Sequence, residues 1–138
     1  MKKLTVVLTV DDAMGLAFNN RRQSRDRNLI EDLMSEINGP VYVTGYSMPL
    51  FEKFADRVYV AEDPIKSCPD GASCFLEMTD ISCFTEIIDK LIIYKWNRLY
   101  PSDVRLSGSP LEHGFRLISA TDFQGSSHEI ITKEIYIK

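Results

Sequence analysis

Short runs of β-branched and apolar residues, separated by stretches of helical periodicity, constrain the fold of this chain most strongly. The runs occupy residues 4–10, 41–45 and 57–61. Between the first two, apolar residues from Leu29 to Ile37 fall one turn apart on one face, with acidic residues on the other. This alternation predicts an α/β domain in which parallel strands are joined by right-handed helical crossovers.

The expected helices have sequence boundaries of their own. Ser24 is a suitable N-cap for the first helix, and Asn38-Gly39-Pro40 supplies a left-handed C-cap followed by proline. Ser47 is placed to cap a second helix that carries Leu50, Phe51 and Phe54. A third helix is expected from about Ser82, with Phe84, Ile87, Ile88 and Leu91 facing inward.

The second half contains the remaining strands. Residues 62–73 hold two prolines and a glycine and are expected to form a loop, followed by a fourth strand at 74–78. Residues 91–96 have strand composition again. Residues 115–120 and 129–136 alternate well enough to form a closing antiparallel pair. We therefore expect a mostly parallel central sheet with a C-terminal antiparallel hairpin and about three helices.

The length and composition of the chain favour a single domain, residues 1–138, with a buried hydrophobic core, because 44% of the residues are hydrophobic and no linker divides the sequence. The chain has no apolar stretch of membrane-spanning length, so we expect a cytoplasmic protein without membrane contact. Three cysteines spaced unlike a zinc knuckle, with two histidines, predict reduced thiols and no metal site.

One basic cluster departs from the acidic character of the chain, whose net charge is -4. Arg21, Arg22, Arg25 and Arg27 lie within seven residues at the expected start of the first helix. A helix N-terminus already favours anions, and arginine grips phosphate or carboxylate through paired hydrogen bonds. The same arginines could instead be solvated, or pair with neighbouring acidic residues on the surface.

The order of elements resembles that of dihydrofolate reductase. The resemblance rests on residues 8–15, which run a first strand into a glycine-bearing loop, on 41–45 and on the closing stretch 114–136. It covers nearly the whole chain by order and spacing, with low residue identity. In that family the first helix opens with a catalytic carboxylate, and Asp26, eleven residues after Gly15, falls close to that place.

The chain departs from that family where the nicotinamide cofactor binds. Reductases follow the glycine that Gly45 matches with an arginine and a threonine that hold cofactor phosphates, whereas here 46–48 are Tyr-Ser-Met. They also carry a Gly-Gly pair after the fourth strand, and this chain has the acidic stretch 77–80 instead. We therefore expect no bound nicotinamide cofactor and no NADPH-dependent hydride transfer.

Short bacterial proteins that share Phe18-Asn19-x-Arg21-Arg22-Gln23-Ser24 and Ser126-Ser127-His128-Glu129-x-Ile131-Thr132-Lys133-Glu134 also resemble this chain, and they often carry the name ribonuclease Z. That enzyme class uses a two-zinc site with many histidines. The two histidines of this chain, fifteen residues apart, cannot supply it.

Two functional hypotheses follow, and the sequence leaves open whether the protein is an enzyme. In the first, Arg21, Arg22 and Arg25 orient a small anionic ligand, pterin-like, nucleotide or phosphorylated, and Asp26 exchanges a proton with it. Ser127 and His128 would share that pocket, although a nucleophilic Ser-His pair needs a third, orienting group, and residues 124–129 could be a plain polar connection. In the second, the arginines of a non-catalytic module meet an acidic protein or RNA.

Overall fold

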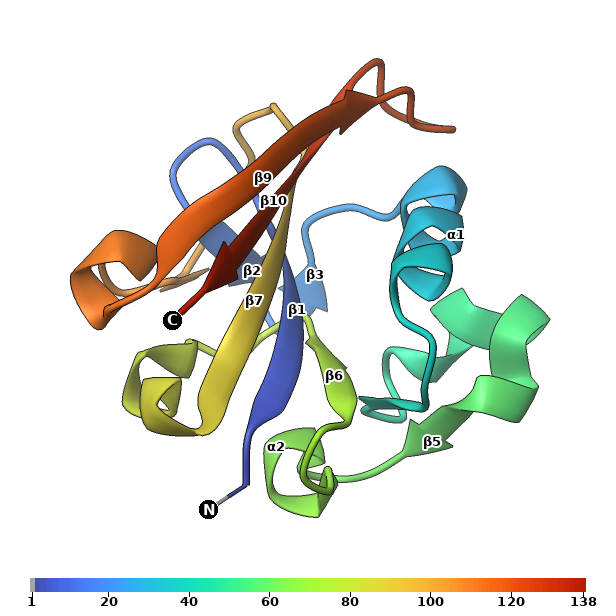
Figure 1. Ribbon diagram of the computed structural model, residues 1–138. Coiled ribbons are helices and arrows are strands. Elements are labelled where there is room, and N and C mark those ends of the chain that lie inside the picture. Colours follow the sequence, from blue (N-terminus) through green and yellow to red (C-terminus); the bar gives the residue numbers. More distant parts are fainter. Residues whose placement is uncertain (1) are drawn as a thin grey trace.

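A twisted seven-stranded sheet forms the centre of the structure (Figure 1). The structure is a computed structural model that describes residues 2–138. The strands of this sheet, in chain order, are β1 (Leu4–Val10), β4 (Val41–Val43), β5 (Val58–Val60), β6 (Ser73–Leu76), β7 (Ile88–Lys95), β9 (Arg116–Phe123) and β10 (Ile131–Ile137). They are arranged in the spatial order β5-β4-β6-β1-β7-β10-β9.

The five strands from β5 to β7 are parallel, and β10 and β9 close the sheet as an antiparallel hairpin. β1 lies between β6 and β7, and all of its residues except Thr5 are buried. A central parallel strand is covered on both faces, which is why its sequence is a nearly continuous apolar run. The predicted α/β class and the predicted terminal hairpin are both confirmed.

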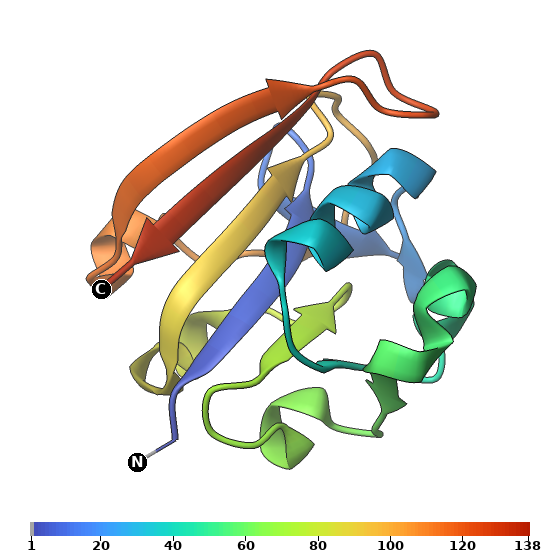
Figure 2. The same ribbon diagram turned by 45° about the vertical axis from the view of Figure 1, so that its right-hand side comes forward.

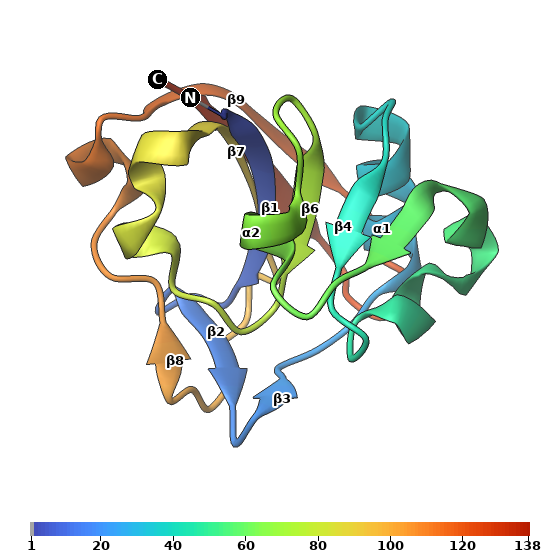
Figure 3. The same ribbon diagram turned by 90° about the horizontal axis from the view of Figure 1, so that it is seen from below.

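A second, three-stranded sheet lies at one end of the large one (Figure 3). It has the order β3-β2-β8 and consists of β2 (Gly15–Phe18), β3 (Arg21–Arg22) and β8 (Val104–Arg105). The first residue of β2 must be glycine, because a Cβ at Gly15 would lie 2.7 Å from both Gln23 Nε2 and Ser102 Cβ. Arg21 and Arg22 form β3, so they belong to a short strand and not to the start of the first helix.

Each of the first three crossovers between the parallel strands contains one helical segment. These segments are α1 (Arg27–Glu36), the 3-10 segment η1 (Met48–Arg57) and the one-turn α2 (Pro64–Ser67). α1 and η1 lie side by side over one face of the sheet (Figure 2), where Leu29, Leu33 and Phe51 are buried. The turn α2 falls inside the stretch expected to be a loop, with Asp63 capping it and Pro64 at its first position.

The ends of α1 differ from the sequence-based expectation. Asp26, not Ser24, is its N-cap, because the Asp26 carboxylate accepts hydrogen bonds from the N–H groups of Asn28 and Leu29. At the other end Ile37 is the C-cap in extended conformation, so the predicted left-handed cap at Gly39 is wrong. The chain turns into β4 before a left-handed residue is needed.

The helix predicted from Ser82 is wrong. Two single 3-10 turns, η2 (Ile81–Cys83) and η3 (Thr85–Ile87), precede β7, and Ile88 and Leu91 are residues of that strand. β7 is paired on both edges, with β1 and β10, and buried on both faces, so its apolar residues have no alternating pattern. A short apolar run of this kind cannot be distinguished from a buried helix by periodicity.

The remaining helical segment, η4 (Pro110–His113), precedes β9. Buried apolar residues form two clusters. One includes Phe51 of η1, Phe75 of β6 and Leu33 of α1, and this cluster packs α1 and η1 against the sheet. None of the helices in the described part of the chain is long and apolar enough to cross a membrane.

Candidate functional site

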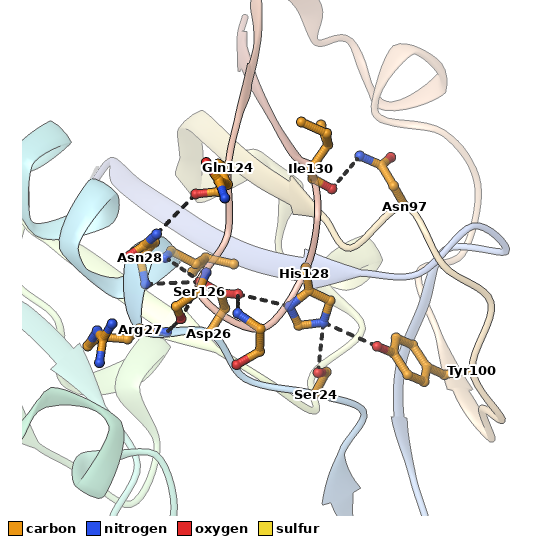
Figure 4. A network of polar contacts seen from close by, with 12 residues as sticks. Ser24, Asp26, Arg27, Asn28, Asn97, Tyr100, Gln124, Ser126, His128 and Ile130 are labelled. Carbon is orange, nitrogen blue, oxygen red and sulfur yellow. Dashed lines mark hydrogen bonds and ion pairs between the residues drawn. The ribbon is translucent and has the colours of Figure 1, made fainter.

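Asp26 lies at the centre of a polar network that joins the start of α1 to the connection between β9 and β10 (Figure 4). Its side chain is fully buried. Oδ1 accepts hydrogen bonds from the N–H groups of Asn28, Leu29 and Ser126 and from the Ser126 hydroxyl, and Oδ2 accepts from Ser127 N–H and from His128 Nδ1. All the lone pairs of this carboxylate are therefore engaged within the chain.

These donors hold Asp26 in its ionised form. Burial alone would raise the pKa of this carboxyl group. The hydrogen bond from His128 and those from the N–H groups of Ser126, Ser127 and Leu29 outweigh burial and lower the pKa of Asp26 well below its ordinary value. A group that donates a proton near neutral pH needs a raised pKa instead, so this environment suits a permanent carboxylate.

His128 continues the network away from Asp26. Its Nδ1 lies 2.9 Å from Asp26 Oδ2. Because a carboxylate only accepts, Nδ1 of a neutral imidazole carries the proton and Nε2 is the acceptor. Two hydroxyls lie within reach of Nε2, that of Ser24 at 2.9 Å and that of Tyr100 at 3.2 Å (Figure 4). The ring stacks on Trp96, with 4.6 Å between centroids, which fixes its plane.

The connection between β9 and β10 folds directly over the first turn of α1. Arg27 N–H donates to Ser126 Oγ at 2.9 Å, and Asn28 Nδ2 donates to the Gln124 carbonyl at 3.1 Å. Gly125 permits this approach, since a Cβ there would lie 2.6 Å from Asp26 Oδ2 and 2.7 Å from the His128 carbonyl oxygen. The first amides of α1 are thus occupied by protein groups.

A cleft of about 420 Å³ opens between α1 and η1, beside the buried carboxylate. Its basic groups are Arg25, Arg27 and Lys53, and its hydroxyls are those of Ser126 and Ser127. Its apolar lining residues include Ile30, Leu50 and Phe54. Lys53 is partly neutralised, because its Nζ lies 2.7 Å from a carboxylate oxygen of Glu31. The two arginines at the mouth therefore give the cleft its charge.

Arg22 has a different environment. Its guanidinium donates two hydrogen bonds to the buried carboxylate of Glu77, with N–O distances of 2.8 and 3.1 Å. It also lies over the ring of Tyr46, with its central carbon 4.3 Å from the ring centroid. The Ser47 hydroxyl donates to the same carboxylate at 2.7 Å, so Ser47 holds Glu77 and not the end of η1. This geometry makes Arg22 the counter-ion of Glu77.

The structure separates the residues that the sequence grouped together. Arg25, Asp26 and Ser127 line one cleft, and His128 lies behind Asp26, whereas Arg21 is exposed on β3 and Arg22 is paired with Glu77. His128 also contributes to a second cleft of about 470 Å³, with Trp96, Arg98 and Ser127 among its lining residues.

Sequence reasoning missed the contact of Ser24 with His128. Ser24 precedes Asp26 by two residues in a segment outside any helix, and Asp26 itself has extended backbone angles. Ser24 Oγ lies 2.9 Å from His128 Nε2 and Asp26 Oδ2 lies 2.9 Å from His128 Nδ1, so both side chains reach one imidazole. Such spacing before a helix is common, so only the three-dimensional position of His128 distinguishes the arrangement.

Within residues 2–138 no group of three His, Cys, Asp or Glu side chains is placed to hold a metal ion. No protein-family model matches the sequence, and no curated protein matches it. Among solved structures, the chain is similar to dihydrofolate reductase from Enterococcus faecalis complexed with NADP(H) and RAB-propyl. The TM-score is 0.67, with 98% of this chain and 95% of that chain covered and 8% sequence identity. At this identity the similarity shows a dihydrofolate reductase-like fold and leaves the chemistry to the site itself.

Proposed function

We propose that this chain, which has the dihydrofolate reductase-like fold, binds a small anionic ligand with a planar apolar body in the cleft between α1 and η1. The observation that carries the proposal is the pairing, in one cleft, of two arginines with an apolar wall. Arg25 and Arg27 are exposed residues of its lining, and Ile30, Leu50 and Phe54 line the same cleft. Binding clefts of this kind place an apolar body and use a few polar groups to orient it.

The charge at this cleft supports an anion as the occupant. The buried charge of Asp26 is satisfied by hydrogen bonds from within the protein, and Glu31 is paired with Lys53. Arg25 and Arg27 are therefore the cations of this cleft that can bind the carboxylate or phosphate of a ligand. The backbone amides of the first turn are already engaged, so side chains and not the helix terminus would bind the anion.

The apolar wall narrows the class of ligand. An aromatic ring placed against Phe54 and Leu50 would leave a carboxylate or phosphate at Arg25 and Arg27. Pterin-like compounds and nucleotides carry both parts, a flat heterocycle and an anionic group. A bare phosphate would use only the basic mouth, and we therefore expect it to bind more weakly.

The proposal does not include NADPH-dependent hydride transfer, because the end of β6 does not fit a dinucleotide. Phosphates are commonly bound by bare amides at the start of a helix. Here the buried carboxylate of Glu77 occupies the residue after β6, held by Arg22 and Ser47, and Asp80 follows as the cap of η2. These groups place negative charge where a pyrophosphate would need donors.

The alternative, an acidic protein or RNA partner, calls for an exposed basic face. Arg22 is instead engaged by Glu77, and Arg25 and Arg27 lie beside a cleft with an apolar wall. We therefore favour the small ligand. Binding of a single-stranded RNA oligonucleotide with no response to folic acid or GMP would favour the alternative.

A thermal-shift panel tests the proposal. Folic acid, GMP, NADP⁺ and inorganic phosphate are added to the wild type and to Arg25→Ala, with Arg116→Ala, an exposed arginine of β9, as the matched control. A ligand at 100 times its dissociation constant stabilises the native state by about 2.7 kcal/mol. We expect folic acid or GMP to raise the midpoint of the wild type and the control, and Arg25→Ala to lose most of the rise. A rise that is unchanged in Arg25→Ala would contradict this location.

A further inference from the structure

Ser24, His128 and Asp26 form a continuous chain of hydrogen bonds from a serine hydroxyl to a buried carboxylate. We propose that Ser24 is a nucleophile that acts on small carboxylic esters or thioesters, with His128 as its general base and Asp26 as the positioning residue of that base. Asp26 Oδ2 lies 2.9 Å from His128 Nδ1, and Ser24 Oγ lies 2.9 Å from His128 Nε2. Both distances are those of hydrogen bonds in an activated serine site.

Asp26 meets the requirements of the third group in such a site. It is buried and is fixed by the N–H groups of Asn28, Leu29, Ser126 and Ser127, so it cannot turn away from the imidazole. The carboxylate holds the proton on Nδ1 and stabilises the imidazolium that forms when Nε2 takes a proton. Stacking on Trp96 restrains the remaining freedom of the ring. The orientation that a serine nucleophile needs is therefore built into the folded chain.

Ser24 is partly buried and lines a small cavity of about 10 Å³, whose lining overlaps that of the cleft between α1 and η1. Arg25, Ile30 and Leu50 line both spaces. An ester whose acid part lies in the cleft would present its carbonyl carbon toward Ser24, and this placement rests on the proposed function. Arg25, which lines both spaces, would supply a cation near the oxygen that becomes negative. The nucleophile itself is defined by its own contacts, whichever ligand occupies the cleft.

The reaction proceeds by acyl transfer. The Ser24 Oγ lone pair forms a bond to the carbonyl carbon, the C=O π pair moves onto the oxygen, and His128 Nε2 takes the Oγ proton. When the carbonyl re-forms, the bond to the leaving alkoxide or thiolate breaks, and His128 returns the proton to it. Water, deprotonated by the same Nε2, then attacks the acyl-serine carbonyl. The C–Oγ bond breaks as the carbonyl re-forms, Nε2 returns its proton to Oγ, and the carboxylic acid is released.

Tyr100 gives the arrangement a distinguishing feature. Its hydroxyl lies 3.2 Å from the same Nε2 and competes with Ser24 for the acceptor. Tyr100→Phe removes the competitor and leaves Ser24 as the hydroxyl at Nε2. A nucleophilic role for Ser24 predicts that acylation is faster in this variant.

Covalent labelling with a fluorophosphonate probe, read by intact mass and peptide mapping, tests Ser24 directly. The probe loses fluoride as Oγ bonds to phosphorus, so the mass increase reports the nucleophile without dependence on the cleft. Ser24→Ala removes it and His128→Gln removes its base, while Ser35→Ala, an exposed serine of α1, is the matched control. Hydrolysis of 4-nitrophenyl acetate is followed in parallel, and thermal melts establish that each variant is folded.

We expect one label on Ser24 in the wild type, in Ser35→Ala and in Tyr100→Phe, no label in Ser24→Ala, and at least a 100-fold slower reaction in folded His128→Gln. An unlabelled, folded wild type would overturn the proposal, and so would a label that persists in Ser24→Ala. If His128→Gln does not fold, the Ser24→Ala and Tyr100→Phe results decide. Ligand binding in the thermal-shift panel without labelling would contradict the role of Ser24 as a nucleophile and would still support anion binding in the cleft between α1 and η1.

Discussion

Oδ2 of Asp26 lies 2.9 Å from Nδ1 of His128, although 102 residues separate the two in the chain. This contact ties the first turn of α1 to the connection between β9 and β10, two segments that no strand pairing joins. The same carboxylate caps the helix and accepts the amides of Ser126 and Ser127. The Asp26 side chain therefore holds both segments in place, and its replacement should destabilise the first turn of α1 and the connection between β9 and β10.

Replacing Asp26 with asparagine should destabilise the protein by about 3 kcal/mol, because one of the two acceptor oxygens of a buried, hydrogen-bonded carboxylate is lost and its donors are left without a partner. The amide NH₂ would face donors, since both carboxylate oxygens accept from N–H groups. Urea unfolding followed by circular dichroism measures the change. Asp56→Asn, an exposed aspartate of η1, is the control and should stay within about 0.5 kcal/mol of the wild type. A fully stable Asp26→Asn protein would contradict the structural role given to this network.

The stability of the protein should fall in acid in a way that depends on Asp26. Its pKa in the folded state is lowered, so its contribution is complete above the unfolded pKa, near 4, and is lost as pH falls toward the folded value. Urea midpoints between about pH 6 and pH 2.5 should therefore decrease more steeply for the wild type than for Asp26→Asn. Parallel curves for the two proteins would show that Asp26 does not carry this dependence.

Arg22 and Arg25 should behave differently although they are three residues apart. Arg22→Ala leaves the buried carboxylate of Glu77 without its counter-ion and should cost about 3 kcal/mol. Arg25 is exposed at the mouth of the cleft, so Arg25→Ala should change stability by less than about 0.5 kcal/mol.

The double variant Arg22→Leu with Glu77→Leu separates the loss of an ion pair from the loss of packing. Because both charges are removed together, it should recover most of the stability lost in Arg22→Ala. Thermal and urea unfolding measure all four proteins. Equal losses in Arg22→Ala and Arg25→Ala would mean that the Glu77 pair contributes nothing specific.

The three cysteines should react at very different rates. Cys68 and Cys74 are buried, and Cys83 is exposed. A hydrogen bond with Cys68 and burial raise the pKa of the Cys74 thiol, which keeps it protonated. Ellman's reagent should therefore modify one thiol rapidly in the native protein and three after unfolding in urea. Cys83→Ser should abolish the rapid phase, and a rapid phase that remains would place a second thiol at the surface.

Sequence patterns predicted the architecture because its strands are short and clearly bounded. The residues 4–10 and 41–45, and the closing pair of strands, were recognisable from β-branched content and alternation. The helix predicted from Ser82 to Leu91 was wrong, because a strand that is buried on both faces has no alternation of apolar and polar residues by which to recognise it. It also failed at the start of α1, where a serine and an aspartate two residues apart are both good caps and tertiary contacts select the aspartate.

The site was only partly predictable for a related reason. Asp26, Arg25, Ser127 and His128 were chosen by residue type and position, and the fold brings Asp26, Ser127 and His128 into contact. The partner of Arg22 could not be foreseen, because Glu77 lies 55 residues away and meets it only through the small sheet. Contacts between distant segments depend on the complete topology, which local patterns do not contain.

The most direct test of the proposed anion binding in the cleft between α1 and η1 is a titration of ¹⁵N-labelled protein with folic acid, and separately with GMP, followed residue by residue through amide chemical shifts. We expect saturable shifts concentrated at Arg25, Arg27, Lys53, Phe54 and Ser127, with Arg25→Ala weakening both titrations. Shifts confined to the segments around Tyr46 and Glu77, or no shift with either compound, would contradict it.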